Sequence, residues 1–101
     1  MKSNRWECIT TSQLVYAKGL LLKGVLITSS AALGEINIYD GQDVTSGRRV
    51  CEIESIAQGT WMTIFGEGLR LERGLYISLD RAVTEVLVWF DPWEIVPETE
   101  E

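Results

Sequence analysis

The stretch EINIYDG at residues 35–41 alternates apolar and polar side chains and then ends in an Asp-Gly pair. A period of two is typical of a β-strand with one buried and one solvent-facing side, and Asp-Gly is a common turn sequence. The stretch GLYISLD at residues 74–80 repeats the design, with Leu75, Ile77 and Leu79 on one side. Both stretches therefore predict half-buried strands.

Other short runs extend this pattern along the chain in both directions. Residues 20–29 predict a long strand with a bend at Gly24, and residues 84–90 predict a strand that is apolar on both sides. Shorter β-rich runs lie at residues 5–10, 13–16, 49–54 and 60–65. No window shows sustained helical spacing of apolar residues. About eight short strands predict an all-β protein, and we expect a single small antiparallel β-sandwich.

The chain has 101 residues, a length that suits one domain with a modest core. We place the β-sandwich domain at residues 1–90 and treat residues 91–101 as a C-terminal arm with an acidic end. Pro92 and Pro97 have no backbone N–H to donate, so we expect this segment to leave the sandwich. The arm carries apolar side chains that it could bury, those of Trp93, Ile95 and Val96.

The net charge of −6 and the absence of histidine argue against several classes of function. An acidic domain without a basic stripe repels phosphate backbones, so we expect no nucleic-acid partner. Nucleophilic triads usually need a histidine base, and no lysine of this chain lies in a catalytic motif. Glu52 and Glu54 share one side of a predicted strand, where we interpret them as solvent-facing groups rather than paired catalytic acids. We expect no enzyme and no cofactor.

Two loops contain residues that are typical of turns. Residues 40–47, DGQDVTSG, offer oxygen ligands, but their spacing does not match an EF-hand loop. A turn is therefore favoured there, with calcium binding as the alternative. Residues 66–68, GEG, lack the lysine of a phosphate-binding loop, and we interpret them as a hairpin turn that leads into a short run at residues 69–72. We assign no metal site.

Four tryptophans exceed what a small core needs. Trp6 and Trp61 are expected in the core. Leu87 and Trp89 lie on the side of their strand that faces away from the expected core, and exposed large apolar groups commonly mark contact sites. We predict a protein interface formed by Leu87, Trp89, Trp93, Ile95 and Val96. The alternative is that the arm folds back and covers the outer side of its own sheet.

Two cysteines, Cys8 and Cys51, are expected to be reduced, partly buried thiols of a protein made in the cytoplasm. A disulfide between them would require neighbouring strands. No signal peptide is recognisable at the start of the sequence, and the most apolar run, residues 20–27, falls short of the roughly 20 residues that cross a bilayer. We therefore expect a soluble protein with no membrane partner.

Three consecutive segments resemble a group of small proteins of tailed bacteriophages. They are KGLLLKGVLIT at residues 18–28, GEINIYDG at residues 34–41 and TSG at residues 45–47. RGLYI at residues 73–77 and the valine-rich run at 83–90 extend this resemblance over most of the domain. The resemblance implies a small β-sandwich virion protein of the capsid decoration, head-fibre or neck type, and it brings no catalytic residues. The Pro-Trp arm and the four tryptophans depart from the pattern.

We therefore expect a structural virion protein, foremost a capsid decoration or other head-associated protein that binds neighbouring capsid subunits. Its partners would be the major capsid protein or a neck protein, together with further copies of itself in a homo-oligomer. The alternative is a carbohydrate-binding or adhesion module of a tail or fibre, in which an exposed Trp61 or Tyr76 stacks on sugars. Glycan binding that is lost on Trp61→Ala would favour this alternative.

Overall fold

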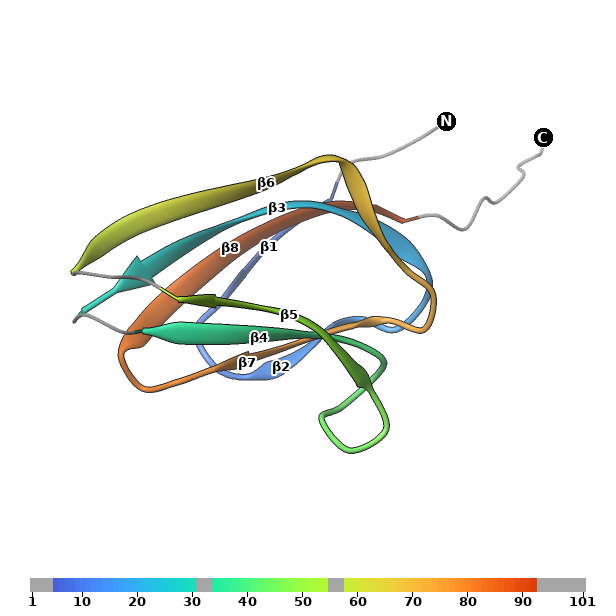
Figure 1. The fold of residues 1–101 in the computed structure, drawn as a ribbon, viewed down its shortest axis with the longest axis horizontal. Helices are drawn as coiled ribbons and strands as arrows, with labels where there is room; N and C mark the ends of the chain where they lie inside the picture. The colour runs from blue at the N-terminus through green and yellow to red at the C-terminus, as the bar shows by residue number, and fades with distance from the viewer. Residues whose placement is uncertain (1–4, 31–33, 55–57, 93–101) are drawn as a thin grey trace.

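The computed structural model describes residues 5–30, 34–54 and 58–92, which form a two-layer antiparallel β-sandwich of eight strands (Figure 1). Sheet A has the strand order β1-β8-β3-β6, and sheet B has the order β2-β7-β4-β5. The strands of sheet A are β1 (Arg5–Ile9), β3 (Leu20–Ser29), β6 (Gly59–Leu71) and β8 (Val83–Pro92). The strands of sheet B are β2 (Gln13–Tyr16), β4 (Glu35–Asp40), β5 (Arg48–Glu54) and β7 (Leu75–Leu79).

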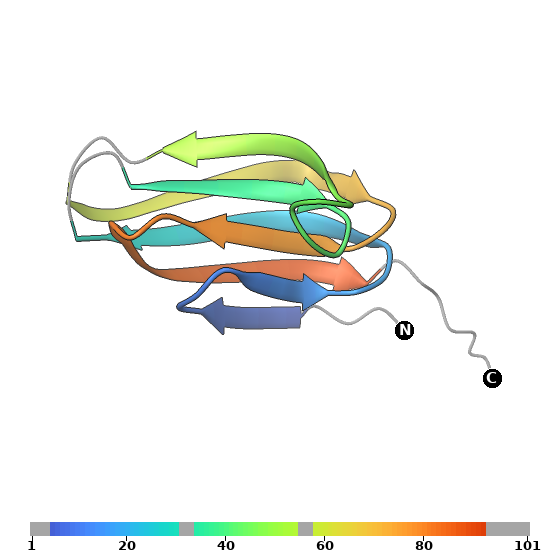
Figure 2. The same cartoon turned by 90° about the horizontal axis from the view of Figure 1, so that it is seen from below.

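The predicted all-β sandwich of about eight strands is confirmed. Most connections carry the chain from one sheet to the other, whereas β4 and β5 are consecutive strands that pair within sheet B. Strands β1 and β2 form the edges on one side of the sandwich, and β5 and β6 form the edges on the other side (Figure 2).

Among the described residues there is no helix long and apolar enough to span a membrane.

The core lies between the two sheets and is built from the alternating inward side chains of the strands. Burying one such apolar side chain stabilises the fold by about 1.5–3 kcal/mol, so this core supplies the main driving force for folding. The buried apolar residues are Ile9, Leu20, Leu22, Val25, Ile27, Ile36, Ile38, Leu71, Leu75, Ile77, Val83, Val86, Val88 and Phe90. The inward sides predicted for the runs at 74–80 and 84–90 are confirmed, with Leu79 half-buried against the core.

The hairpin turn predicted at residues 66–68 is wrong, because these residues lie inside the single long strand β6. Strand β3 pairs with β6 on both sides of the Gly-Glu-Gly segment, since Leu22 lies opposite Leu69 and Gly24 lies opposite Ile64. The extra residues of β6 between these two pairs form a bulge. Gly66 and Gly68 have positive φ angles, 62° and 121°. Glycine adopts such angles readily, so these two residues allow the backbone to form the bulge.

Strand β8 continues two residues past the expected start of the arm, because Asp91 and Pro92 pair with Leu21 and Leu20 of β3. The proline is tolerated because the pairing of β1 with β8 reaches only to Phe90, so Pro92 has a neighbour on one side alone among the described residues. The sandwich therefore includes residues that the sequence assigned to the arm.

Candidate functional site

The outer side of sheet A carries an apolar face that crosses all four strands. Cross-strand partners point to the same side of a sheet, so the register arranges the outward residues in rows. One row runs Trp6, Trp89, Gly24 and Ile64, and the next runs Cys8, Leu87, Leu26 and Met62. We call the six large apolar residues of these rows the outer apolar face: Trp6, Leu26, Met62, Ile64, Leu87 and Trp89.

Three of these side chains are largely open to solvent. Trp6 is 59% exposed, Met62 57% and Ile64 63%, and these residues come from the two edge strands, β1 and β6. The central residues Leu26 and Leu87 are half-buried between them. Isolated exposed apolar residues are ordinary on protein surfaces, whereas a contiguous group across a whole sheet is typical of a contact site.

A stack of two indole rings organises one end of this face. The Trp89 ring lies directly over Gly24, where an added Cβ would overlap Cζ2 and lie 2.7 Å from Cη2 of that ring. Trp6 stacks on Trp89, with ring centroids 5.2 Å apart and an interplanar angle of 21°. Such aromatic pairs contribute about 0.5–1.5 kcal/mol beyond the area that they bury. Because Gly24 has no side chain, the Trp89 ring can pack against the backbone at this position, and Trp6 stacks on that ring.

The interface residues predicted from the sequence fall into two groups, one on strand β8 and one beyond the described residues. Leu87 and Trp89 lie on the outer side of sheet A, as predicted. Trp93, Ile95 and Val96 lie outside the described residues. The outward position of Leu87 and Trp89 is thus confirmed, whereas the protein interface itself stays a prediction for all five residues.

The structure corrects the assignment of Trp6 and places Trp61 on the inner side of its sheet. The core position expected for Trp6 is wrong, because its pairing with Trp89 turns it to the outer side of the sheet. Trp61 pairs with the buried Ile27 and is half-buried, so it lies on the inner side near the β6 edge. The half-buried Trp61 therefore does not offer the exposed ring that the adhesion alternative would need for stacking on sugars.

Met62 and Ile64 are functional candidates that the sequence did not single out. Residues 60–65 contain apolar side chains on both sides of the strand, so a period of two could not decide which side faces the core. The pairing of β6 with β3 decides it, because Met62 lies opposite Leu26 and Ile64 opposite Gly24.

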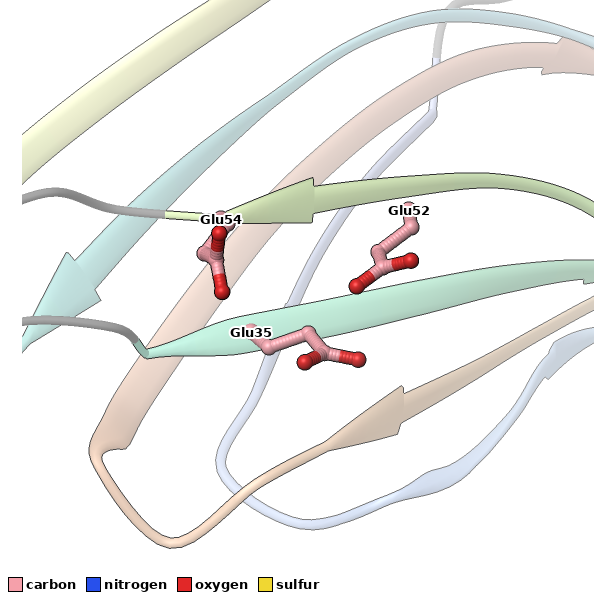
Figure 3. Close-up of side chains that lie close together, drawn as sticks. All are labelled: Glu35, Glu52 and Glu54. Atoms are coloured by element: carbon pink, nitrogen blue, oxygen red, sulfur yellow. The ribbon is translucent and has the colours of Figure 1, made fainter.

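An acidic cluster lies on the outer side of sheet B, where a carboxylate oxygen from each of Glu35, Glu52 and Glu54 lies within 4.8 Å of the others (Figure 3). The pKa of Glu52 is raised, first by a hydrogen bond to Glu35 and then by the charge of that neighbour. Arg49 approaches Glu52 at 3.5 Å and partly offsets the repulsion. These three carboxylates, of which Glu35 is half-buried and the other two are exposed, fall short of the six or more oxygen ligands that calcium takes.

The two carboxylates of the loop at residues 40–47 accept hydrogen bonds from backbone, one from the loop itself and the other from the neighbouring residues 72–73. Asp43 Oδ1 accepts hydrogen bonds from the backbone N–H groups of Thr45 and Ser46 and from the Ser46 hydroxyl, which lowers the pKa of Asp43. Asp40 Oδ1 accepts the backbone N–H groups of Glu72 and Arg73. A polar pocket of about 390 Å³ lies beside this loop. These bonds support the turn interpretation over calcium binding, because the side-chain oxygens serve the turn.

The two cysteines are free thiols in different sheets, Cys8 on β1 and Cys51 on β5. Partial burial is confirmed for Cys51, but Cys8 is exposed. The Cys8 thiol donates a hydrogen bond of 2.8 Å to Glu85, and this bond raises the pKa of the thiol. A bond that holds the proton disfavours the reactive thiolate.

The fold and the outer apolar face together define an all-β sandwich in which one sheet carries large apolar side chains on its outer side. A scan against protein-family models and a search of curated proteins found no match to the chain.

Proposed function

We propose that this protein is a structural binding module that docks on another protein through the outer apolar face of sheet A. The observation that carries the proposal is that two neighbouring rows of outward residues bring the six large apolar side chains of the outer apolar face together on one side of sheet A. Removing such a face from water is favourable in proportion to its apolar area, whereas leaving it open invites non-specific association.

The composition of this face fits a specific contact. Tryptophan is enriched among the residues that dominate binding energy, and the Trp6–Trp89 stack is held in place by packing before a partner arrives. A face that is already ordered loses little conformational entropy on binding. Stable interfaces bury about 1,200–2,000 Å² in total, so we infer that the face forms the centre of a larger contact.

The resemblance of residues 18–90 to small tailed-bacteriophage proteins supplies the proposed setting. We propose a structural virion protein, made in the host cytoplasm, whose partner is a major capsid or neck protein. A capsid decoration protein that binds only the assembled shell would stabilise that shell by mass action. This role needs no catalytic group, cofactor or metal, and the net charge of −6 argues against a nucleic-acid partner.

The gene neighbourhood and a co-sedimentation assay test the proposal. Genes for a major capsid protein or a capsid protease beside this gene would support a head role. Purified capsid shells from that phage should sediment the protein, and Trp6→Ser should weaken binding by about 2 kcal/mol, which is about thirtyfold.

Leu14→Ser is the matched control, because Leu14 is 38% exposed on sheet B and therefore probes the opposite layer. It should leave capsid binding unchanged. Equal loss of binding in both variants, or full binding by Trp6→Ser, would contradict docking through the outer apolar face. Binding of the isolated protein to a glycan array, with no affinity for capsids, would instead favour the adhesion alternative.

A further inference from the structure

Strand β6 forms an edge of sheet A, and its residues have the features of an edge to which another strand can pair. Strand β6 pairs with β3 on one side, and no strand of the described residues pairs with its other side. Its segment TWMTIF, residues 60–65, has no charge and no proline. Edge strands of monomeric proteins are usually protected by charges, prolines or bulges, because their free N–H and C=O groups bind other strands. This segment has none of these protections along its length.

The bulge at residues 66–68 sets the limit of the available edge. Gly66 and Gly68 have φ angles of 62° and 121°, which turn the backbone out of regular strand geometry. Gly59 also has a positive φ angle, 140°, so the regular part of the edge runs from Thr60 to Phe65. It offers about six residues, which is close to the usual length of a strand.

We propose that β6 pairs antiparallel with β6 of a second copy of this chain, across a twofold axis at Thr63. This register places Met62 opposite Ile64 of the second copy on the outer side. On the inner side it places Trp61 opposite Phe65 of the second copy. The two four-stranded sheets A then form one continuous eight-stranded sheet.

A second copy fits this edge because the segment is complementary to itself. Apolar residues meet apolar residues on both sides of the joined sheet, and the residue on the axis is a small uncharged threonine. Two chains of charge −6 repel each other at a distance, yet residues 60–65 place no like charges opposite one another. Pairing also covers Met62 and Ile64, the most exposed apolar residues of the β6 edge.

Sedimentation velocity on the full chain over a concentration series tests this proposal independently of capsid docking. The wild-type protein should form a dimer. In the double variant Met62→Lys/Ile64→Lys the register sets lysine opposite lysine twice, and the dimer dissociation constant should rise by about tenfold or more. Both side chains point to solvent, so circular dichroism should show an unchanged fold. Val44→Lys, at a loop residue that is 49% exposed, is the matched control and should leave the dimer intact.

Charge complementation tests the register. Mixing Met62→Lys/Ile64→Lys with Met62→Glu/Ile64→Glu should restore a mixed dimer, because each lysine then lies opposite a glutamate. A wild-type chain that stays monomeric, a lysine variant that still dimerises, or a mixture that does not associate would overturn the proposal. A dimer that is lost in Trp6→Ser would overturn it as well, since that result shows association through the sheet face instead of the edge.

Discussion

At the scale of single residues, Gly24 and Trp89 show how one position depends on another far away in sequence. From the sequence, Gly24 predicts a bend in a strand, and β3 is indeed irregular between Leu22 and Gly24. The tertiary structure adds a second reason for glycine, because the Trp89 ring occupies the space that a side chain would need. The tryptophan pair therefore depends on the absence of a side chain at this position.

Gly24→Ala tests this dependence. The new methyl group would displace the Trp89 ring, and we expect a loss of about 1–3 kcal/mol in the free energy of unfolding, as is typical of overpacking. Urea unfolding followed by circular dichroism measures the change. In a Trp89→Ala background the same substitution should cost much less, because the clash is gone. An equal cost in both backgrounds would show that the ring and the glycine are not coupled.

At the scale of elements, the bulge in β6 depends on two glycines with different surroundings. Gly66 has φ 62° and open space where a Cβ would lie, whereas Gly68 has φ 121° and a Cβ there would lie 3.0 Å from Cβ of Leu21. A left-handed conformation near φ 60° is accessible to asparagine, but φ near 120° favours glycine alone.

We therefore expect Gly66→Asn to keep nearly all of the stability of the protein. Gly68→Ala should lower the free energy of unfolding by about 1–2 kcal/mol, because it adds backbone strain to a close contact. Thermal and urea unfolding of the two variants compares them directly. If Gly66→Asn were the more damaging change, the bulge would not have the geometry described.

The pairing of β4 with β5 places Glu35 opposite Glu54 and beside Glu52, which makes this pair of strands sensitive to pH. The pKa of Glu52 is raised in the folded state, chiefly by Glu35, so the folded protein holds that proton more tightly than the unfolded chain does. The repulsion is therefore relieved as the pH falls through the raised pKa, and it acts fully above it.

Glu35→Gln should accordingly raise the melting temperature at pH 7 and have less effect at acid pH, where Glu52 holds its proton and the repulsion is relieved. Differential scanning calorimetry at several pH values measures this difference. Glu67→Gln is a suitable control, because Glu67 is an exposed carboxylate outside the cluster. A gain that was the same at both pH values would rule out charge repulsion as its cause.

At the scale of the whole molecule, Pro92 ends the last strand that the structure describes. A chain that ends at Pro92 keeps all the described strands and all the buried apolar residues among the described ones. We expect this truncated chain to fold with nearly the same melting temperature and to bind capsids more weakly, because it lacks Trp93, Ile95 and Val96 of the predicted interface. Unfolding of the truncated chain would show that these residues belong to its own core.

The fold could be predicted well because its signals are local. Alternation in residues 35–41 and 74–80 shows which side chains are buried, and turn residues separate most of the strands, although the Gly-Glu-Gly segment at 66–68 lies inside β6. The site was predicted in part: Leu87 and Trp89 follow from the alternation in β8. Trp6, Met62 and Ile64 did not follow, since β1 and β6 are edge strands whose outward side depends on the strand that they pair with.

The amino-acid sequence by itself determined the class of fold, most of the strands and the acidic, histidine-free composition, because period, turn chemistry and charge act between near neighbours in the chain. Only the tertiary structure decided that Trp6 stacks on Trp89 over Gly24, that residues 66–68 form a bulge, and that the apolar face crosses the whole of sheet A. These features arise from pairing between strands far apart in sequence, and the register of such pairs is set by the packing of the complete core.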